Sequence, residues 1–197
     1  MTNYRNKGFT LIELLIVMAI LGVLAVVVLV AINPAQQLAR TRDAGRKSSV
    51  TQLGHSLEAY YTSHSGEYLD ASNCLLADGG PLLSAWIGCL VFAGEMSSVP
   101  TEIANSVGHV DNVHCSTLAV DAPLEGEQNE YCYVVNGTSS AAIIWTVLES
   151  QTEESKCPVT QTPNFIWNTT DGRGGTVCLD DDTQPSVGTY VGDYEED

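Results

Sequence analysis

The longest pattern in the chain is a continuous apolar run near its N-terminus. Residues 9–32 are all apolar or alanine except for Thr10, Glu13 and Gly22. At a rise of about 1.5 Å per residue, a helix of this length is about 36 Å long, which is enough to cross the hydrocarbon core of a bilayer. The run is too long for a secretory signal and does not end in a small-residue cleavage site. We therefore predict a membrane-spanning helix over residues 9–32.

A helical pattern continues beyond the run. Six residues recur at spacings of three and four and so share one face of a helix: Val50, Leu53, Leu57, Tyr60, Tyr61 and His64. Pro34 lacks a backbone donor and clashes with the carbonyl four residues before it, so we expect a kink or short melt there. Gly22 is a second such point, and Ser65-Gly66 is a natural stop. Residues 33–66 are thus predicted to form an amphipathic continuation of the helix that packs against a sheet.

Strand signals lie in the C-terminal part of the chain. Apolar, β-branched and aromatic residues at 131–135 and 142–148 flank the sequence Asn-Gly-Thr-Ser, which is a strong hairpin signal. A third strand is expected at 176–179, after a glycine-rich turn. Residues 67–124 mix apolar pieces with glycine and proline, so we expect a short helix and an irregular loop there. Three or four antiparallel strands packed on the helical stripe would make residues 67–197 the head of an α+β protein.

Charge is distributed unevenly along the chain. The net charge is −16, yet six of the eight basic residues precede position 48 and 22 of the 24 acidic residues follow it. The head is therefore strongly acidic, and strong direct binding of nucleic-acid phosphates is not expected. Basic residues lie on both sides of the apolar run, so charge alone does not settle which way the chain crosses the membrane.

All six cysteines lie in the acidic head. They form no C-x-x-C motif and no zinc-type cluster with histidine, so we predict three disulfides in an oxidising compartment. Six reduced thiols in a cytosolic domain are the alternative. Six cysteines allow many pairings, which the sequence alone does not separate. Proximity in the chain predicts three pairs: Cys74 with Cys89, Cys115 with Cys132, and Cys157 with Cys178.

The heptapeptide KGFTLIE, residues 7–13, joins a short basic leader to the apolar run. This arrangement resembles the prepilin signal of bacterial type IV pilins and of the pseudopilins of type II secretion systems. The resemblance implies that residues 1–8 are a leader peptide, that a prepilin peptidase cleaves after Gly8, and that the new N-terminus, Phe9, is methylated. It also implies a type IV pilin-like α+β fold and a single pass through the bacterial cytoplasmic membrane, with the head outside.

Glu13 is the one acidic residue inside the apolar run, and an ionised carboxylate there needs a partner. Cleavage after Gly8 would leave a cationic amine on Phe9 at the bilayer edge. The resemblance implies that Glu13 serves assembly, because the amine of an incoming subunit can meet the carboxylate of a subunit already in a filament. A low dielectric strengthens that pair. The alternative is that Glu13 of an isolated anchor reaches the lipid headgroups.

No sequence motif predicts catalysis, since nucleophile-elbow, zinc-protease, P-loop and dinucleotide-binding patterns are all absent. We therefore expect no enzyme activity and no cofactor. Four acidic residues near the C-terminus nevertheless offer oxygen ligands of the kind that Ca²⁺ prefers: Asp171, Asp180, Asp181 and Asp182. Their spacing does not match an EF-hand, and a solvated acidic surface is the commoner meaning of such a run.

The pattern and the resemblance together predict a structural protein. The chain would be a subunit of a type IV pilus-like helical filament, a homo-oligomer built by an assembly ATPase and an inner-membrane platform. The filament would be an extracellular pilus, or a periplasmic pseudopilus if the chain is a type II secretion pseudopilin. An alternative of another class is a monomeric membrane-anchored binding module that presents an acidic head.

Four basic residues follow the predicted span closely: Arg40, Arg42, Arg46 and Lys47. Acidic heads packed along a filament repel one another, and these residues hold most of the positive charge outside the leader. We hypothesise that they offset the repulsion between neighbouring subunits. The alternative is that they contact anionic lipid headgroups before the subunit leaves the membrane.

Overall fold

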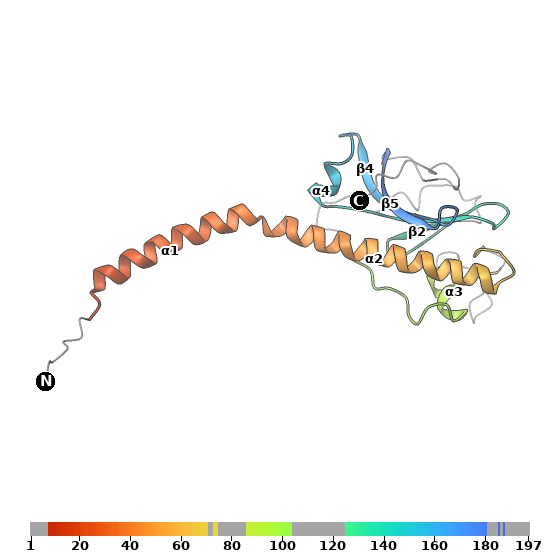
Figure 1. Ribbon diagram of the computed structural model, residues 1–197, viewed down its shortest axis with the longest axis horizontal. Helices are drawn as coiled ribbons and strands as arrows, with labels where there is room; N and C mark the ends of the chain where they lie inside the picture. The colour runs from red at the N-terminus through yellow and green to blue at the C-terminus, as the bar shows by residue number, and fades with distance from the viewer. Residues whose placement is uncertain are drawn as a thin grey trace. The chain divides into compact units, whose positions relative to one another are not determined.

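The computed structural model describes residues 8–70, 73–74, 86–103, 125–180, 185 and 187. The chain divides into two compact units, one reaching Leu38 and the other starting at Ala39. We call them the N-terminal unit and the head unit and describe each by itself. Figure 1 labels the four helices and strands β2, β4 and β5, with numbering that follows the chain.

The N-terminal unit consists of helix α1 (Leu11–Ile32) and the first residues of helix α2 (Pro34–Ser63). The break between the helices falls at Asn33, which takes a left-handed conformation with φ of 45°. Proline suits the first position of a helix because its missing N–H would have no partner there. The interruption predicted at Pro34 is therefore present. The one predicted at Gly22 is not, because α1 runs through that residue as regular helix.

The surface of α1 is apolar except at Glu13 and has no buried residue. Even Phe9, just before the helix, is 86% exposed. Within the described ranges, one helix is long and apolar enough to cross a membrane, and it contains α1. Leucine, valine and isoleucine side chains left in water are unfavourable in proportion to their area, so this helix requires a cover from outside the chain.

In the head unit, the remainder of α2 packs its predicted stripe against the sheet. Val50, Leu53, Leu57 and Tyr60 are buried, while Tyr61 is half-buried. His64, the last residue of the stripe, is exposed, and its ring stacks on that of Tyr60 at a centroid distance of 3.8 Å. The helix stops as predicted, because Ser65 and Gly66 both have positive φ.

The sheet has five antiparallel strands in chain order, namely β1 (Glu125–Gln128), β2 (Tyr131–Val135), β3 (Ala142–Val147), β4 (Gln161–Asn168) and β5 (Arg173–Asp180). The hairpin predicted from Asn-Gly-Thr-Ser is β2–β3, with Val135 opposite Ala142. The third predicted strand lies inside β5. Strands β1 and β4 were not specifically predicted. A long helix packed on an antiparallel sheet confirms the α+β, pilin-like fold.

Two short helices complete the described part of the head. Helix α3 (Trp86–Phe92) falls in the region where a short helix was expected, and Trp86 stacks on Tyr133 at 4.8 Å between ring centroids. Helix α4 (Gln151–Glu154) follows β3. The face of the sheet toward α2 contributes Ile144, Phe165 and Trp167 to the main core. The other face carries a second buried cluster that contains Ile143, Trp145 and Ile166.

Disulfides link distant parts of the head. The structure joins Cys74 to Cys89 and Cys157 to Cys178, which are two of the pairs that chain proximity predicts. Cys132 is also disulfide-bonded. Its predicted partner, Cys115, lies outside the described residues. A crosslink that closes a loop of about 15 residues stabilises a fold by about 3 kcal/mol in the chain-entropy model.

Candidate functional site

Thr10 and Glu13 form a capping box at the start of α1. The Thr10 backbone N–H and its hydroxyl each donate a hydrogen bond to Glu13 Oε2 at 2.8 Å. In return, the Glu13 N–H points at Thr10 Oγ1 at 3.3 Å. The sequence Thr-Leu-Ile-Glu has the spacing that this motif requires, since threonine at the cap and glutamate three residues later satisfy each other's donors.

The capping box gives the Glu13 carboxylate a partner within its own chain. Both of these hydrogen bonds are accepted by Oε2, and neither is accepted by Oε1. Inside a bilayer, an unsatisfied backbone N–H is costlier than in water, so the cap stabilises the end of the helix most where lipid surrounds it. Thr10 was not among the predicted site residues, although the spacing T-x-x-E ahead of an apolar run is a sufficient signal for this cap.

Gly8 and Phe9, the predicted cleavage and methylation positions, precede this cap. Both are exposed and lie outside the helix. A side chain added at Gly8 would meet no atom within 4 Å. The bond between them therefore joins two exposed residues outside regular secondary structure, where a peptidase has access to it. Residues 1–7 of the leader lie outside the described residues.

The basic residues after the apolar run have partners in the head itself. The Arg42 guanidinium forms an ion pair with Glu149 through its Nε atom. Arg46 Nη1 lies 3.1 Å from Asp43 Oδ1 and 3.2 Å from Glu149 Oε1. We call Arg42, Asp43, Arg46 and Glu149 the ion cluster. The hydrogen bond to Glu149 raises the pKa of Arg42 above its ordinary value.

The ion cluster is held by the backbone as well as by charge. Asp43 accepts hydrogen bonds from the N–H groups of Glu149, at 3.0 Å, and Ser150, at 2.8 Å. Arg46 Nη2 donates to the carbonyl oxygen of Ile103 at 2.8 Å. Three segments that are distant in sequence, namely α2, the β3–α4 connection and the chain at residue 103, therefore meet at this cluster.

A third basic residue is also paired inside the head. Lys47 Nζ lies 3.0 Å from Glu153 Oε1 on α4, and Lys156 Nζ lies 3.3 Å from the other oxygen of Glu153. Arg42, Arg46 and Lys47, which the hypothesis assigns to offsetting repulsion between subunits, therefore pair with carboxylates of their own chain, and the intersubunit role stays a prediction. Arg40 is exposed and remains compatible with that hypothesis.

The acidic residues proposed as calcium ligands are only partly described. Asp180 lies at the end of β5 and accepts a hydrogen bond from Gln161 Nε2 at 3.2 Å. Asp171 lies in the β4–β5 turn, while Asp181 and Asp182 lie outside the described residues. In the part of the chain that the structure describes, no three histidine, cysteine, aspartate or glutamate side chains gather in a way that would hold a metal ion.

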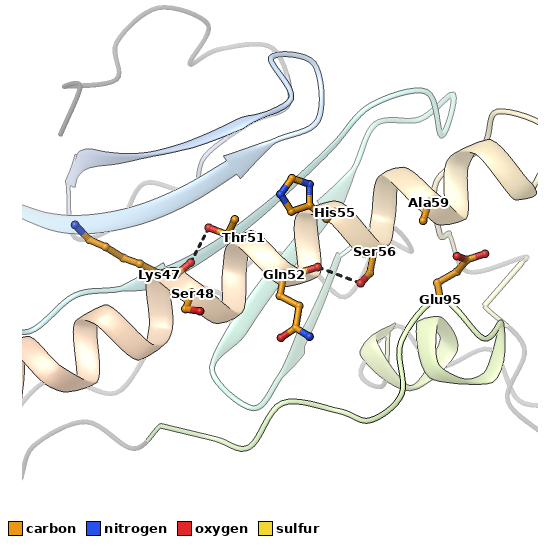
Figure 2. A pocket seen from close by; sticks show the side chains of 8 residues that line it. All are labelled: Lys47, Ser48, Thr51, Gln52, His55, Ser56, Ala59 and Glu95. Atoms are coloured by element: carbon orange, nitrogen blue, oxygen red, sulfur yellow. Dashed lines mark hydrogen bonds between the residues drawn. The ribbon is translucent and has the colours of Figure 1, made fainter.

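A groove of about 650 Å³ runs along α2 in the head unit, lined by residues of the helix and by Glu95 (Figure 2). Two of its hydroxyl groups, those of Thr51 and Ser56, are bound to their own helix. Thr51 Oγ1 donates to the Lys47 carbonyl at 2.8 Å, and Ser56 Oγ donates to the Gln52 carbonyl at 3.0 Å (Figure 2). The groove therefore presents neither of these hydroxyls as a nucleophile.

Comparison with known proteins gives matches that include the N-terminal motif. Residues 3–29 match the family model of the prokaryotic N-terminal methylation motif. The fimbrial protein of Neisseria meningitidis serogroup B (strain ATCC BAA-335 / MC58) is 44% identical over 71 residues, which is 34% of this chain and 37% of that protein. The type IV major pilin protein PilE1 of Neisseria gonorrhoeae is 43% identical over 67 residues, which is 32% of this chain and 36% of that protein.

The chain thus carries a prepilin-type methylation motif and is similar to type IV pilins over about a third of its length. It spans only a little more than a third of the length of these relatives. Both relatives are named as fimbrial or pilin proteins and not as enzymes. No solved structure matches the chain.

Proposed function

We propose that the chain is a structural subunit of a type IV pilus-like helical filament. In this proposal a prepilin peptidase cleaves after Gly8, Phe9 is methylated, and α1 holds the subunit in the cytoplasmic membrane with the head outside. An assembly ATPase and an inner-membrane platform then move it into the filament. The observation that carries the proposal is α1 itself, an apolar helix without one buried residue that begins at a prepilin-type motif.

The exposed apolar surface of α1 suits two apolar environments, one before assembly and one after it. Lipid can cover it before assembly, and the same helix of other copies can cover it in a filament, since both environments are apolar. A permanent lipid anchor would need only apolar residues, whereas α1 also carries Glu13. The capping box occupies one oxygen of that carboxylate, and the other is available to a partner that arrives with another copy.

The amine that cleavage would leave on Phe9 is such a partner. Thr10 binds Oε2 of Glu13, so the free oxygen Oε1 can accept the amine of a neighbouring copy. A charge pair of this kind is far stronger in an apolar filament core than in water. The pair would also select the axial offset between copies, because each amine must reach a carboxylate one helical turn along its neighbour.

Mass spectrometry of the mature protein tests the processing step. We expect an N-terminus at Phe9 with one added methyl group. An intact N-terminus, or cleavage beyond α1, would contradict the proposal. A cell surface or periplasm that holds long filaments containing this chain would support the assembly step, and the compartment would separate a pilus from a pseudopilus.

The variant Glu13→Gln tests the docking role of the carboxylate. It keeps the size of the side chain and removes its charge, so we expect membrane insertion and cleavage to persist while filaments become sparse. The matched control is Leu14→Val, a conservative change at the adjacent exposed position of α1. Filaments of normal number in Glu13→Gln would show that the charge has no docking role. Methylation should be measured separately in both variants.

A further inference from the structure

The ion cluster fixes the part of α2 that enters the head first. Arg46 is 1% exposed, Asp43 is 2% exposed and Glu149 is 5% exposed, so their charges are almost wholly removed from water. Burial of this degree is costly unless each charge has partners. Here Arg46 has two carboxylates and the Ile103 carbonyl, and Glu149 has both Arg42 and Arg46.

The attachment of α2 to the head changes in kind along the helix. From Val50 to Tyr60 the buried residues of α2 that join the main core are apolar. Between residues 40 and 47 the buried residues are Asp43 and Arg46, which are both charged. The packing of residues 40–47 on the head therefore depends on the ionisation of these side chains, while the packing of the apolar stripe does not.

The hydrogen bonds of Asp43 add to this dependence. Its carboxylate accepts from two backbone N–H groups of the β3–α4 connection, at Glu149 and Ser150. Protonation of either carboxylate would weaken it as an acceptor and leave the buried Arg46 with one counter-charge instead of two. An unpaired buried charge is strongly destabilising, and water entering the site is the simplest relief.

We propose that the ion cluster is an acid-released latch, whose opening frees residues 40–47 of α2 from the head while the stripe from Val50 to Tyr60 stays packed. Arg42 and Arg46 pair with Glu149, and Asp43 pairs with Arg46. Among the described residues, further charged groups on the same elements are Lys47 of α2 and Lys156 after α4, which both pair with Glu153 of α4, while Tyr131 of β2 interacts with Arg46. With every acid ionised, these groups comprise four cations and three carboxylates. Protonation of either buried acid raises the excess of positive charge from one to two, so acid favours the open form.

The latch has a use that rests on the proposed function. In a filament, residues 40–47 lie between the helix that packs with other copies and the apolar part of the head. When the latch is closed, the head is fixed to residues 40–47 of α2 and moves with them. When it is open, the head can tilt on its helix without unfolding, and the filament can yield to load or acid without losing subunits.

Hydrogen exchange of the full chain in detergent micelles tests the latch without requiring filaments. The variant Glu149→Gln removes the charge and keeps the shape of the side chain. The matched control is Glu154→Gln, which removes the same charge from an exposed residue of α4. Amide exchange at residues 40–47 is compared with exchange at residues 53–60, after correction for the intrinsic rate at each pH.

At pH 7 we expect Glu149→Gln to speed exchange at residues 40–47 by about tenfold or more, because removing one partner of a buried pair is costly. Exchange at residues 53–60 should change by less than about twofold, since local opening does not require global unfolding. The wild type should show the same selective increase between pH 7 and about pH 3.5, which lies below the ordinary pKa of a carboxyl group. Glu154→Gln should behave as wild type at both pH values.

Two results would overturn the latch. One is unchanged exchange at residues 40–47 in the wild type at acid pH. The other is an equal increase along α2 through Tyr60, which would mean global loss of stability. The acid series uses wild-type protein, so it decides the question even if Glu149→Gln does not fold. A chain that shows the latch but forms no filaments would contradict the proposed function and leave the latch intact.

Discussion

The indole ring of Trp167 lies against the backbone of Gly54, so that a Cβ at position 54 would overlap the ring carbons. This is a direct approach of α2 to strand β4. The ring of His55 packs edge-on against the same indole at a centroid distance of 4.7 Å. Glycine at this one position therefore sets how closely the helix can approach the sheet.

We expect Gly54→Ala to destabilise the head. Alanine is the better helix former by about 1 kcal/mol, but forcing Trp167 aside in a packed core costs about 1–3 kcal/mol or more. The matched control on the same helix is Gly45→Ala, whose new Cβ would meet only the terminal methyl of Ile103 at 2.8 Å, a group that can rotate away. Denaturant unfolding of the head measures both. Equal stability of Gly54→Ala and wild type would mean that the Trp167 indole can move aside without a measurable free-energy cost.

The paired basic residues lead to a prediction about salt. A triple variant with glutamine at Arg42, Arg46 and Lys47 should lose about 3–5 kcal/mol of head stability, because the buried carboxylates of Asp43 and Glu149 lose their counter-charges. Added salt should not restore it, since ions screen exposed charges and reach buried ones poorly. Arg40→Gln, at an exposed position, should leave stability unchanged. If added salt restored the stability or the filament number of the triple variant, the result would favour the hypothesis that these basic residues offset repulsion between subunits.

Sequence reasoning found the elements whose residues match their surroundings. The spacing of Val50, Leu53 and Leu57 predicted a packed helical face, and those residues are buried. The turn sequence at Asn136 predicted the β2–β3 hairpin, where the Asn136 side chain accepts N–H bonds from Ser140 and Ala141. In these cases local preference and tertiary packing agree.

The missed features depend on contacts that a local pattern does not contain. Strand β4 includes Pro163 and two asparagines, which are poor strand formers, yet it lies between β3 and β5. Its proline sits opposite Cys178, and its carbonyl accepts from the N–H of Leu148 at 2.9 Å. The ion cluster pairs Arg46 with Glu149, which is 103 positions away, so charge counting along the chain could not separate an intrachain partner from another subunit.

Exposure separates the two described disulfides. Cys74 and Cys89 are buried, whereas Cys157 and Cys178 are both partly exposed. Thiol–disulfide exchange requires access of the attacking thiolate, so a mild reductant should open Cys157–Cys178 first. Timed alkylation and peptide mapping measure the order. Complete reduction should add about 6 Da if all six cysteines are paired in three bridges. Earlier reduction of Cys74–Cys89 would contradict the buried position of that pair.

Tyr133 gives the head a predictable response to alkali. Burial raises the pKa of its hydroxyl well above the ordinary value, and the hydroxyl donates to the Leu69 carbonyl at 2.8 Å. Above about pH 10, tyrosine in the unfolded chain loses its proton while the buried one keeps it. Stability therefore falls as pH rises, by about 1.4 kcal/mol per pH unit for this group.

The variant Tyr133→Phe should remove that part of the alkaline loss. It should also cost about 1 kcal/mol at neutral pH, because the Leu69 carbonyl loses its donor. Unfolding in denaturant at pH 8 and at a pH above the unfolded tyrosine range compares the two proteins. Parallel curves for wild type and variant across this range would show that Tyr133 ionises as readily in the folded head as in the unfolded chain.

Thr10 should affect both the start of α1 and the placing of Glu13. Thr10→Val keeps the shape of the side chain and removes the hydroxyl that accepts from the Glu13 N–H and donates to Glu13 Oε2. Loss of an N-cap costs about 1 kcal/mol, so residues 11–14 should exchange their amide hydrogens faster in micelles. Thr10→Ser keeps the hydroxyl and should restore slow exchange.

The same pair of variants separates a helix cap from a role in assembly. If Thr10 also holds the carboxylate for a neighbouring amine, Thr10→Val should lower filament number while cleavage after Gly8 proceeds, and Thr10→Ser should restore it. Faster exchange with normal filaments would confine Thr10 to capping. Unchanged exchange would mean that the hydrogen bonds between Thr10 and Glu13 do not form in micelles. There would then be no reason to expect Oε1 rather than Oε2 of Glu13 to bind the amine of a neighbouring copy.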